Sequence, residues 1–269
     1  MIIGSIPENK DLEKRISLVP DIIKKYTNLG LEVNIVKGYG DHLGFNDDTF
    51  KNAGAKILLS KEEVIKNSNI LIQLDMINEN DFSILSKDKI LIGSMNYSKN
   101  KDKIEKLKSN GVNIFSLELL PRITRAQSMD ILSSQANLAG YKAVIEAFAF
   151  FEKAIPMMMT AAGTVPAAKV LVVGAGVAGL QAVATAKRMG AVVFATDVRM
   201  ASKEQVESLG GKFLTVEGSE NLETEGGYAK EASEEFKKKQ EELLSETLKK
   251  IDIVICTALI PGKKAPIIL

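Results

Sequence analysis

A glycine-rich segment followed by an acidic residue is the part of this sequence whose residue types and spacing most clearly suggest chemistry. Gly174, Gly176 and Gly179 stand at GxGxxG spacing directly after an apolar run, and Asp197 comes 23 positions after Gly174. Such glycines permit a tight turn, let backbone N–H groups approach a diphosphate, and let a helix pack closely on a strand. The segment 169–197 therefore predicts a dinucleotide-binding βαβ unit.

The acid at the end of the second predicted strand indicates which dinucleotide would bind. The carboxylate of Asp197 can accept hydrogen bonds from both hydroxyls of an adenosine ribose and would repel a 2′-phosphate, so NAD(H) is favoured over NADP(H). Arg199 lies two positions further on and could soften this preference. A tight turn without any ligand is the alternative, but strand, helix, second strand and acid in register favour dinucleotide binding.

The elements that must position these residues follow from a regular alternation. Short β-type runs alternate with helical patterns along the chain, which favours parallel sheets with helices on both faces. The predicted strands are 1–6, 32–36, 55–59, 69–74, 89–93, 112–116, 170–173, 192–196, 212–216 and 252–257. The predicted helices include 18–29, 101–107, 127–151, 177–189 and an exposed, charged helix within 230–250.

We expect an α/β fold of two Rossmann-like, doubly wound parallel-sheet domains joined by the long helix 127–151. The N-terminal Rossmann-like domain would span residues 1–130, and the NAD(H)-binding domain would span residues 131–269. Within the long helix, the run 143–151 is apolar nearly all round, so we expect it to be buried.

Two segments flank the dinucleotide unit. Segment 160–168 is rich in small residues and is expected to form a loop that leads into the unit. The polar segment 217–228 is long, as lids in α/β proteins often are. Only four strands are predicted after the long helix, whereas a doubly wound dinucleotide domain has about six. We therefore expect the C-terminal part of this domain to be missing from the sequence.

Composition argues against several classes of function. The 269 residues are 45% hydrophobic, enough for two buried cores, and 35 basic against 34 acidic residues suggest no nucleic-acid surface. Cys256, the only cysteine, lies in an apolar run typical of a core strand, and the only histidine, His42, lies in a segment typical of a loop or cap. We therefore expect no intrachain disulfide and no metal site. No apolar run approaches the ~20 residues that cross a bilayer, and the composition fits a reducing cytosol.

A second group of polar residues lies in segment 118–141, which reads ELLPRITRAQSMDILSSQANLAGY. Its candidate functional residues are Arg122, Gln127, Asp130 and Ser133. From residue types alone, a loop followed by a helix start with Ser128 or Asp130 as N-cap is the simpler explanation.

This segment closely resembles the catalytic loop of the NAD(H)-binding component, domain I, of proton-translocating NAD(P) transhydrogenases, members of the alanine dehydrogenase/transhydrogenase family. Other segments are similar to the same family: GSIPENKDLEKRISLVP at the start, the dinucleotide unit GAGVAGLQAVATAKRMGAVV, and the later GGYAKEASEEFKKKQ and TALIPGKKAPIIL. The resemblance covers essentially the whole chain.

The resemblance implies direct hydride transfer between NADH and NADP⁺, the latter bound on a partner domain. It implies a set of residues around the nicotinamide, namely Arg122, Gln127, Asp130 and Ser133. It also implies a set of residues that bind the rest of NAD(H), namely Gly174, Ala175, Gly176, Val177, Gly179, Asp197, Val198, Arg199, Gly227, Tyr228, Gln240 and Leu259. The implied partners are an NADP(H)-binding β subunit or domain, membrane-spanning subunits and a second copy of the chain in a homodimer. The chain would then be cytoplasmic and docked peripherally on the membrane through those subunits.

Two other functions stay open from the sequence. Alanine dehydrogenases share the family's fold, but the resemblance implies that their chemistry needs a lysine where this chain has Gln73 and a histidine where it has Asn96. Neither side chain can act as an acid or base near neutral pH, so an alanine-dehydrogenase-like enzyme is disfavoured. A non-catalytic NAD-binding module is the third possibility.

Overall fold

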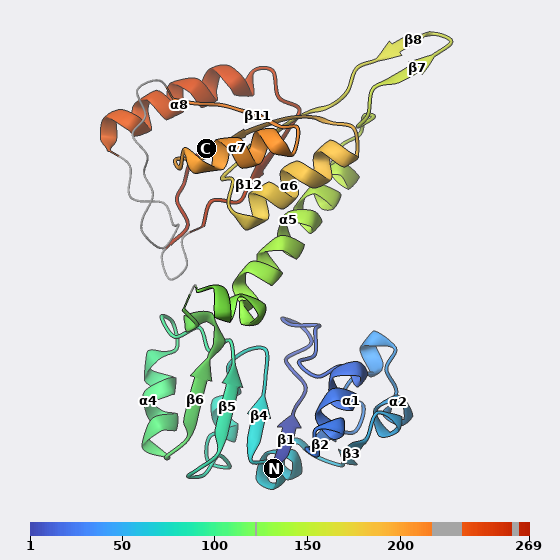
Figure 1. Ribbon diagram of the computed structural model, residues 1–269, viewed down its shortest axis with the longest axis vertical. Helices are drawn as coiled ribbons and strands as arrows, with labels where there is room; N and C mark the ends of the chain where they lie inside the picture. The colour runs from blue at the N-terminus through green and yellow to red at the C-terminus, as the bar shows by residue number, and fades with distance from the viewer. Residues whose placement is uncertain (122, 217–232, 260–263) are drawn as a thin grey trace. The chain divides into compact units, whose positions relative to one another are not determined.

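The computed structural model describes residues 1–121, 123–216, 233–259 and 264–269 (Figure 1). Internal contacts divide the chain into two compact units, Met1–Asp130 and Ile131–Leu269. Each unit is built on a parallel sheet flanked by helices, so the predicted α/β fold class is confirmed.

The first unit contains a six-stranded sheet in the order β3-β2-β1-β4-β5-β6, with every pair of neighbours parallel. Its strands are β1 Ile2–Ser5, β2 Glu32–Val36, β3 Ala55–Leu58, β4 Ile70–Ile72, β5 Ile90–Gly93 and β6 Asn113–Ser116. Its helices are α1 Pro20–Asn28, α2 Asp47–Asn52, α3 Lys61–Asn67 and α4 Lys101–Ser109, with 3₁₀ turns η1 Asp41–Leu43, η2 Glu79–Asp81, η3 Leu117–Leu119 and η4 Thr124–Met129. The strand order reverses between β1 and β4.

Two apolar clusters cover the opposite faces of this sheet. Ile23 of α1 and Phe50 of α2 pack on one face, while Val64 of α3 and Leu107 of α4 belong to the cluster on the other. Successive side chains of a strand point to opposite faces, so short, almost wholly apolar strands can feed both clusters at once.

The second unit begins with the long helix α5 Ile131–Phe150. The antiparallel hairpin β7 Met158–Thr160 and β8 Gly163–Val165 follows, and then β9 Lys169–Val173, α6 Val177–Arg188, β10 Val192–Thr196, α7 Ala201–Ser208, β11 Lys212–Phe213, α8 Glu234–Leu248 and β12 Ile253–Cys256. The parallel sheet of this unit has the order β11-β10-β9-β12. The sequence 169–197 thus folds as the predicted strand–turn–helix–strand unit.

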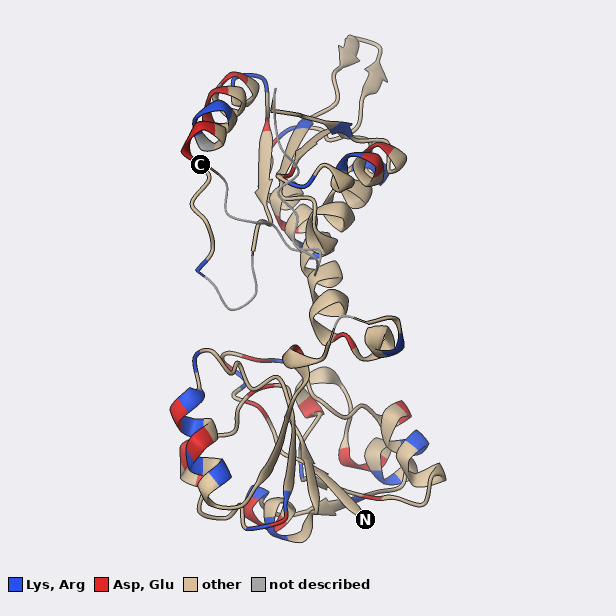
Figure 2. Cartoon of the chain, turned by 60° about the vertical axis from the view of Figure 1, so that its left-hand side comes forward, with Lys and Arg blue, Asp and Glu red and all other residues tan. Residues whose placement is uncertain are grey.

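The central strand β9 is buried on both faces. Val170 and Val172 lie in a cluster with α5, α6 and α7, whereas Leu171 and Val173 pack against Leu244 of α8. The rest of α8 carries charged side chains along its length (Figure 2). This agrees with the exposed, charged helix expected within 230–250, of which 230–232 lie outside the described residues.

Expectations about two segments are wrong. Segment 160–168 is not only a loop, because it contains β8 and the end of β7. The apolar run 143–151 is not buried throughout, since Phe150 is 84% exposed. Only the stripe Gly140, Val144 and Phe148, at four-residue spacing, is buried on α5. A helix packed on one side buries one stripe, whatever the residues on its other side.

Three smaller differences concern single elements. The long helix begins at Ile131 rather than at 127, because Thr124–Met129 form a 3₁₀ helix. Cys256 lies on a strand as expected, but it is exposed rather than in the core, because alternate residues of β12 face outwards. No helix in the described parts of the chain combines the length and apolarity needed to cross a bilayer.

Candidate dinucleotide-binding site

The three glycines between β9 and α6 have different structural reasons. Gly174 has φ +93°, and a Cβ built on it would lie 2.8 Å from the backbone nitrogen of Ala258. A Cβ on Gly179 would collide with the carbonyl oxygen of Gly174, so only glycine lets α6 approach the turn this closely. A Cβ on Gly176 would meet only Nη2 of Arg199 within 4 Å, at 3.7 Å. Gly176 therefore leaves its backbone open to a ligand, while the other two serve the turn and its packing.

The amino end of α6 is available to a negatively charged group. Gly176 is the N-cap of the helix and has no side chain that could accept from the first-turn N–H groups. Those N–H groups have no intrahelical acceptor, and the helix dipole adds a partial positive charge to them. Val177, the first residue of the helix, is 39% exposed. The turn and the helix end together fit a diphosphate.

Asp197 lies beside this turn at the end of β10. Its Oδ2 accepts a hydrogen bond from the backbone nitrogen of Ala175 at 2.6 Å. Arg199 donates to Oδ1 from its backbone nitrogen and from Nε, and to Oδ2 from Nη2, each at 2.9 Å. The side chain of Asp197 is 7% exposed and that of Arg199 is 18% exposed. The acid thus joins the ends of β9 and β10, next to the glycines, where a bound ribose would need an acceptor.

Thr257 is a residue at this turn that sequence reasoning missed. Its Oγ1 donates to the carbonyl oxygen of Gly174 at 2.7 Å, and its backbone nitrogen donates to that of Val173 at 2.8 Å. These bonds fix the glycine turn against the end of β12. No motif in the sequence marks this threonine, because the contact joins residues more than 80 positions apart.

The remaining predicted residues of this unit are more dispersed. Val198 is half-buried between Asp197 and Arg199, and Leu259 follows β12 with 65% of its surface exposed. Gln240 is half-buried on α8. Among the described residues, no hydrogen bond links Gln240 to the glycine turn. Gly227 and Tyr228 lie outside the described residues.

The polar segment before α5 is only partly described, because Arg122 lies outside the described residues. Gln127 is exposed on η4, and its carbonyl oxygen accepts from the backbone nitrogen of Asp130 at 3.3 Å. Ser133 lies in the first turn of α5. Ala126 is buried and anchors this 3₁₀ helix, so the polar residues beside it are held at the surface.

A second polar cluster lies at the carboxyl ends of β1 and β4 in the first unit. Gln73 is 3% exposed, and its Oε1 accepts from the backbone nitrogen of Ile6 at 2.9 Å and from Ser5 Oγ at 3.1 Å. Its Nε2 donates to the carbonyl oxygen of Ile6 and to Glu8 Oε1. Burial raises the pKa of the Glu8 carboxyl. The amide of Gln73 is therefore occupied by the protein itself.

Asn96 is exposed on the loop after β5, with φ +48°. The carboxylate of Glu118 holds this loop by accepting from the backbone nitrogens of Met95 and Tyr97, each at 3.1 Å. Gln73 and Asn96 thus take part in a satisfied network and an exposed loop, and neither supplies an acid or base.

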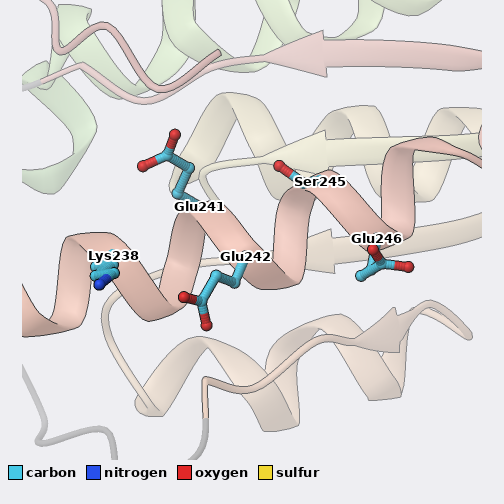
Figure 3. Close-up of a pocket in the computed structure, with 5 residues that line it drawn as sticks. All are labelled: Lys238, Glu241, Glu242, Ser245 and Glu246. Carbon is cyan, nitrogen blue, oxygen red and sulfur yellow. The ribbon is translucent and has the colours of Figure 1, made fainter.

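A shallow depression on α8 has the character of a solvated surface. It is lined by Lys238, Glu241, Glu242, Ser245 and Glu246, all of which come from this one helix (Figure 3). The stick view shows the side chains along the outside of the helix rather than converging on one point. We therefore assign no ligand to it.

The fold and the glycine turn together define an α/β protein of the dinucleotide-binding, Rossmann-type class. Comparisons with known proteins agree. The family model described as "Alanine dehydrogenase/PNT, N-terminal domain" matches residues 4–139, and "Alanine dehydrogenase/PNT, C-terminal domain" matches residues 143–269. This chain belongs to the alanine dehydrogenase/PNT family.

Relatives place the chain nearer to one branch of that family. It is 49% identical over 269 residues to an NAD(P) transhydrogenase subunit alpha of Rhodospirillum rubrum, a match that covers 97% of this chain and 70% of that protein. The crystal structure of transhydrogenase from Sinorhizobium meliloti superimposes with a TM-score of 0.85 and 42% identity, covering 99% of this chain and 72% of that one. An alanine dehydrogenase of Mycolicibacterium smegmatis is only 27% identical, over 99% of this chain and 67% of that protein. The resemblance inferred from the sequence is confirmed.

Proposed function

We propose that this chain is the NAD(H)-binding component of a proton-translocating NAD(P) transhydrogenase. The observation that carries the proposal is the open Gly176 turn beside the Asp197 carboxylate, in a chain whose relatives at 40–49% identity are named as transhydrogenase α subunits. The reaction is NADH + NADP⁺ ⇌ NAD⁺ + NADPH, with both dinucleotides as substrates. NADP(H) is held by a partner subunit or domain.

In this proposal the second unit binds the adenosine and diphosphate end of NAD(H). The backbone of 174–179 faces the diphosphate, with Ala175 and Val177 beside it, and Asp197, Val198 and Arg199 hold the adenosine ribose. Gln240, Leu259 and the segment that contains Gly227 and Tyr228 close over the dinucleotide. These assignments rest on the family resemblance together with the position of the turn.

Arg122, Gln127, Asp130 and Ser133 would act by positioning the nicotinamide. Asp130 and Ser133 hold its carboxamide, Arg122 fixes the ring, and Gln127 faces the ribose and the incoming NADP(H). Direct hydride transfer needs no protein acid or base, but it needs the two C4 atoms within about 3–3.5 Å of each other. The absence of an acid or base at Gln73 and Asn96 is therefore compatible with this reaction, whereas it argues against reductive amination of a 2-oxo acid.

The assembly belongs to the same proposal. The chain would be cytoplasmic and would dock on the membrane through an NADP(H)-binding β subunit and membrane-spanning subunits, which carry the proton. A homodimer is supported by the β7–β8 hairpin, which extends from the rest of its unit (Figure 1). The three consecutive methionines 157–159 are 57%, 42% and 83% exposed. Flexible apolar side chains of this kind are typical of contact surfaces.

Hydride transfer in a reconstituted system tests the proposal. The purified chain is mixed with NADH and a purified NADP(H)-binding transhydrogenase subunit loaded with NADP⁺, and NADPH formation is followed. We expect transfer that depends on both proteins, and we expect Gln127→Asn to lower its rate far more than NADH affinity, because the ring is misplaced while the main binding contacts remain.

Two outcomes would favour the other functions. Oxidation of NADH that depends on pyruvate and ammonium would establish an alanine-dehydrogenase-like enzyme. NADH binding without any transfer to the loaded partner would favour a non-catalytic NAD-binding module.

A further inference from the structure

The carboxylate of Asp197 has no acceptor position left for a ribose. A carboxylate offers about four lone-pair positions, and here four N–H groups use them. Two come from the backbone, at Ala175 and Arg199, and two come from the guanidinium of Arg199. The backbone bonds belong to the glycine turn and the strand end, so they stay in place when a ligand arrives.

The guanidinium therefore occupies the positions that a ribose would use. A vicinal diol presents two O–H donors, and the guanidinium presents two N–H donors, from Nε and Nη2, to the same two oxygens. The hydroxyls can be accepted fully only if the side chain of Arg199 leaves the carboxylate. This exchange costs free energy, because both members of the pair are largely buried and a charge separated from its partner there is destabilising.

The displaced side chain has a second acceptor within reach. Nη2 of Arg199 lies 3.7 Å from the Cβ position of Gly176, beside the backbone that faces the diphosphate in the proposed site. A guanidinium binds phosphate oxygens with the same fork of donors that it offers to a carboxylate. A ligand with a diphosphate can thus compensate for the lost ion pair, whereas a ligand without one cannot.

We propose that Arg199 is a specificity-determining residue that makes the site select for ligands carrying both a ribose diol and a diphosphate. In the empty protein it holds Asp197 in place of the ribose, and on binding it exchanges the carboxylate for the diphosphate. Phosphate-free ribosides such as adenosine are excluded, because they must break the Asp197–Arg199 pair without replacing it. This inference rests on the NAD(H) site of the proposed function.

The test measures two ligands against the same variants. Adenosine and ADP-ribose are titrated as competitors of NADH fluorescence on the wild-type chain, on Arg199→Gln and on Arg199→Lys. Arg188→Gln is the matched control, because Arg188 is exposed at the far end of α6. Thermal unfolding of each variant is recorded alongside.

The effects of Arg199→Gln on the two ligands should have opposite signs. We expect adenosine to compete about tenfold better than with wild type and ADP-ribose about tenfold worse, each equal to one hydrogen-bonded charge contact of about 1.4 kcal/mol. Arg199→Lys keeps the charge but not the fork, so adenosine should gain while ADP-ribose stays near its wild-type affinity. Arg188→Gln should change neither ligand.

Parallel changes would overturn the inference. If both ligands weaken alike in Arg199→Gln, or if adenosine competes no better with either variant than with wild type, Arg199 does not compete with the ribose. These results leave the proposed function intact as long as wild type binds NADH. A wild-type chain that binds no NADH would instead refute the NAD(H) site itself.

Discussion

The glycines at 174, 176 and 179 share a motif but not a role. Gly174 and Gly179 are required by close contacts within the turn, while Gly176 faces open space. The motif therefore separates into residues that build the turn and one that exposes it, and substitutions should separate the two contributions.

Alanine at Gly176 should affect binding without affecting folding. Its φ of −75° suits any residue and its Cβ would meet only Arg199, so we expect the free energy of unfolding to change by less than about 0.5 kcal/mol. The added methyl would stand between the backbone and the diphosphate, so NADH affinity should fall about tenfold or more. Fluorescence titration and urea unfolding of the same preparation measure both quantities.

Alanine at Gly179 is the matched comparison, and it should do the reverse first. Its Cβ would collide with the carbonyl oxygen of Gly174, which is backbone and cannot move away freely. We expect a loss of stability of about 1–3 kcal/mol, as in other overpacked sites. Equal stabilities for the two variants would contradict the roles assigned here.

At this scale the sequence predicted the glycines and the acid, but not their partners. Spacing alone brings Asp197 to the end of β10, because the βαβ unit fixes where the second strand ends. The bonds from Arg199 and Thr257 depend on side-chain conformation and on a strand that is distant in the sequence, and no local pattern encodes either. The sequence indicated that Arg199 could weaken a preference for NAD(H), but not that it occupies the acceptor.

The contact between α5 and α6 is the central feature at the scale of elements. Gly140 of α5 lies against Ala178 of α6, and a Cβ on Gly140 would collide with the carbonyl oxygen of Ala178. Val144 and Phe148 continue the same stripe into the core of the second unit. The long helix is therefore fixed to the helix whose amino end forms the candidate site.

Gly140→Ala should destabilise the second unit although alanine is the better helix former. We expect a loss of about 1–3 kcal/mol from the backbone collision, against a gain of up to about 1 kcal/mol in helix propensity. Ala139→Ser, at an exposed neighbouring position of the same helix, is the control and should change little. Thermal unfolding measures both variants, and a Gly140→Ala protein at least as stable as wild type would contradict this close packing.

Element type was predictable where the apolar period was clear, and it failed where burial depended on neighbours. Strands 32–36 and 192–196 agree with β2 and β10 at both ends. The hairpin β7–β8 was missed because its residues are exposed and show no alternation between buried and exposed positions. Burial of Phe150 was wrongly expected because an apolar run does not reveal whether anything packs against its far side.

At the scale of the whole molecule, the chain consists of two parallel α/β units with separate polar centres. In the first unit, Gln73 and Glu8 satisfy one another at the point where strand order reverses. In the second, the glycine turn leaves its backbone open and its acid is held by a displaceable arginine. Only the second arrangement fits a dinucleotide, which is why the proposed function assigns binding to residues 131–269.

Equilibrium titration of the purified chain with NADH and with NADPH, followed by nicotinamide fluorescence, tests the central claim most directly. We expect NADH to bind clearly more tightly than NADPH. We also expect Asp197→Asn to weaken NADH by about 1–3 kcal/mol, because the ribose hydroxyls lose a charged acceptor. Tighter binding of NADPH, an unchanged NADH affinity in Asp197→Asn, or no binding of either dinucleotide would contradict the assignment of the glycine turn and Asp197 as an NAD(H) site.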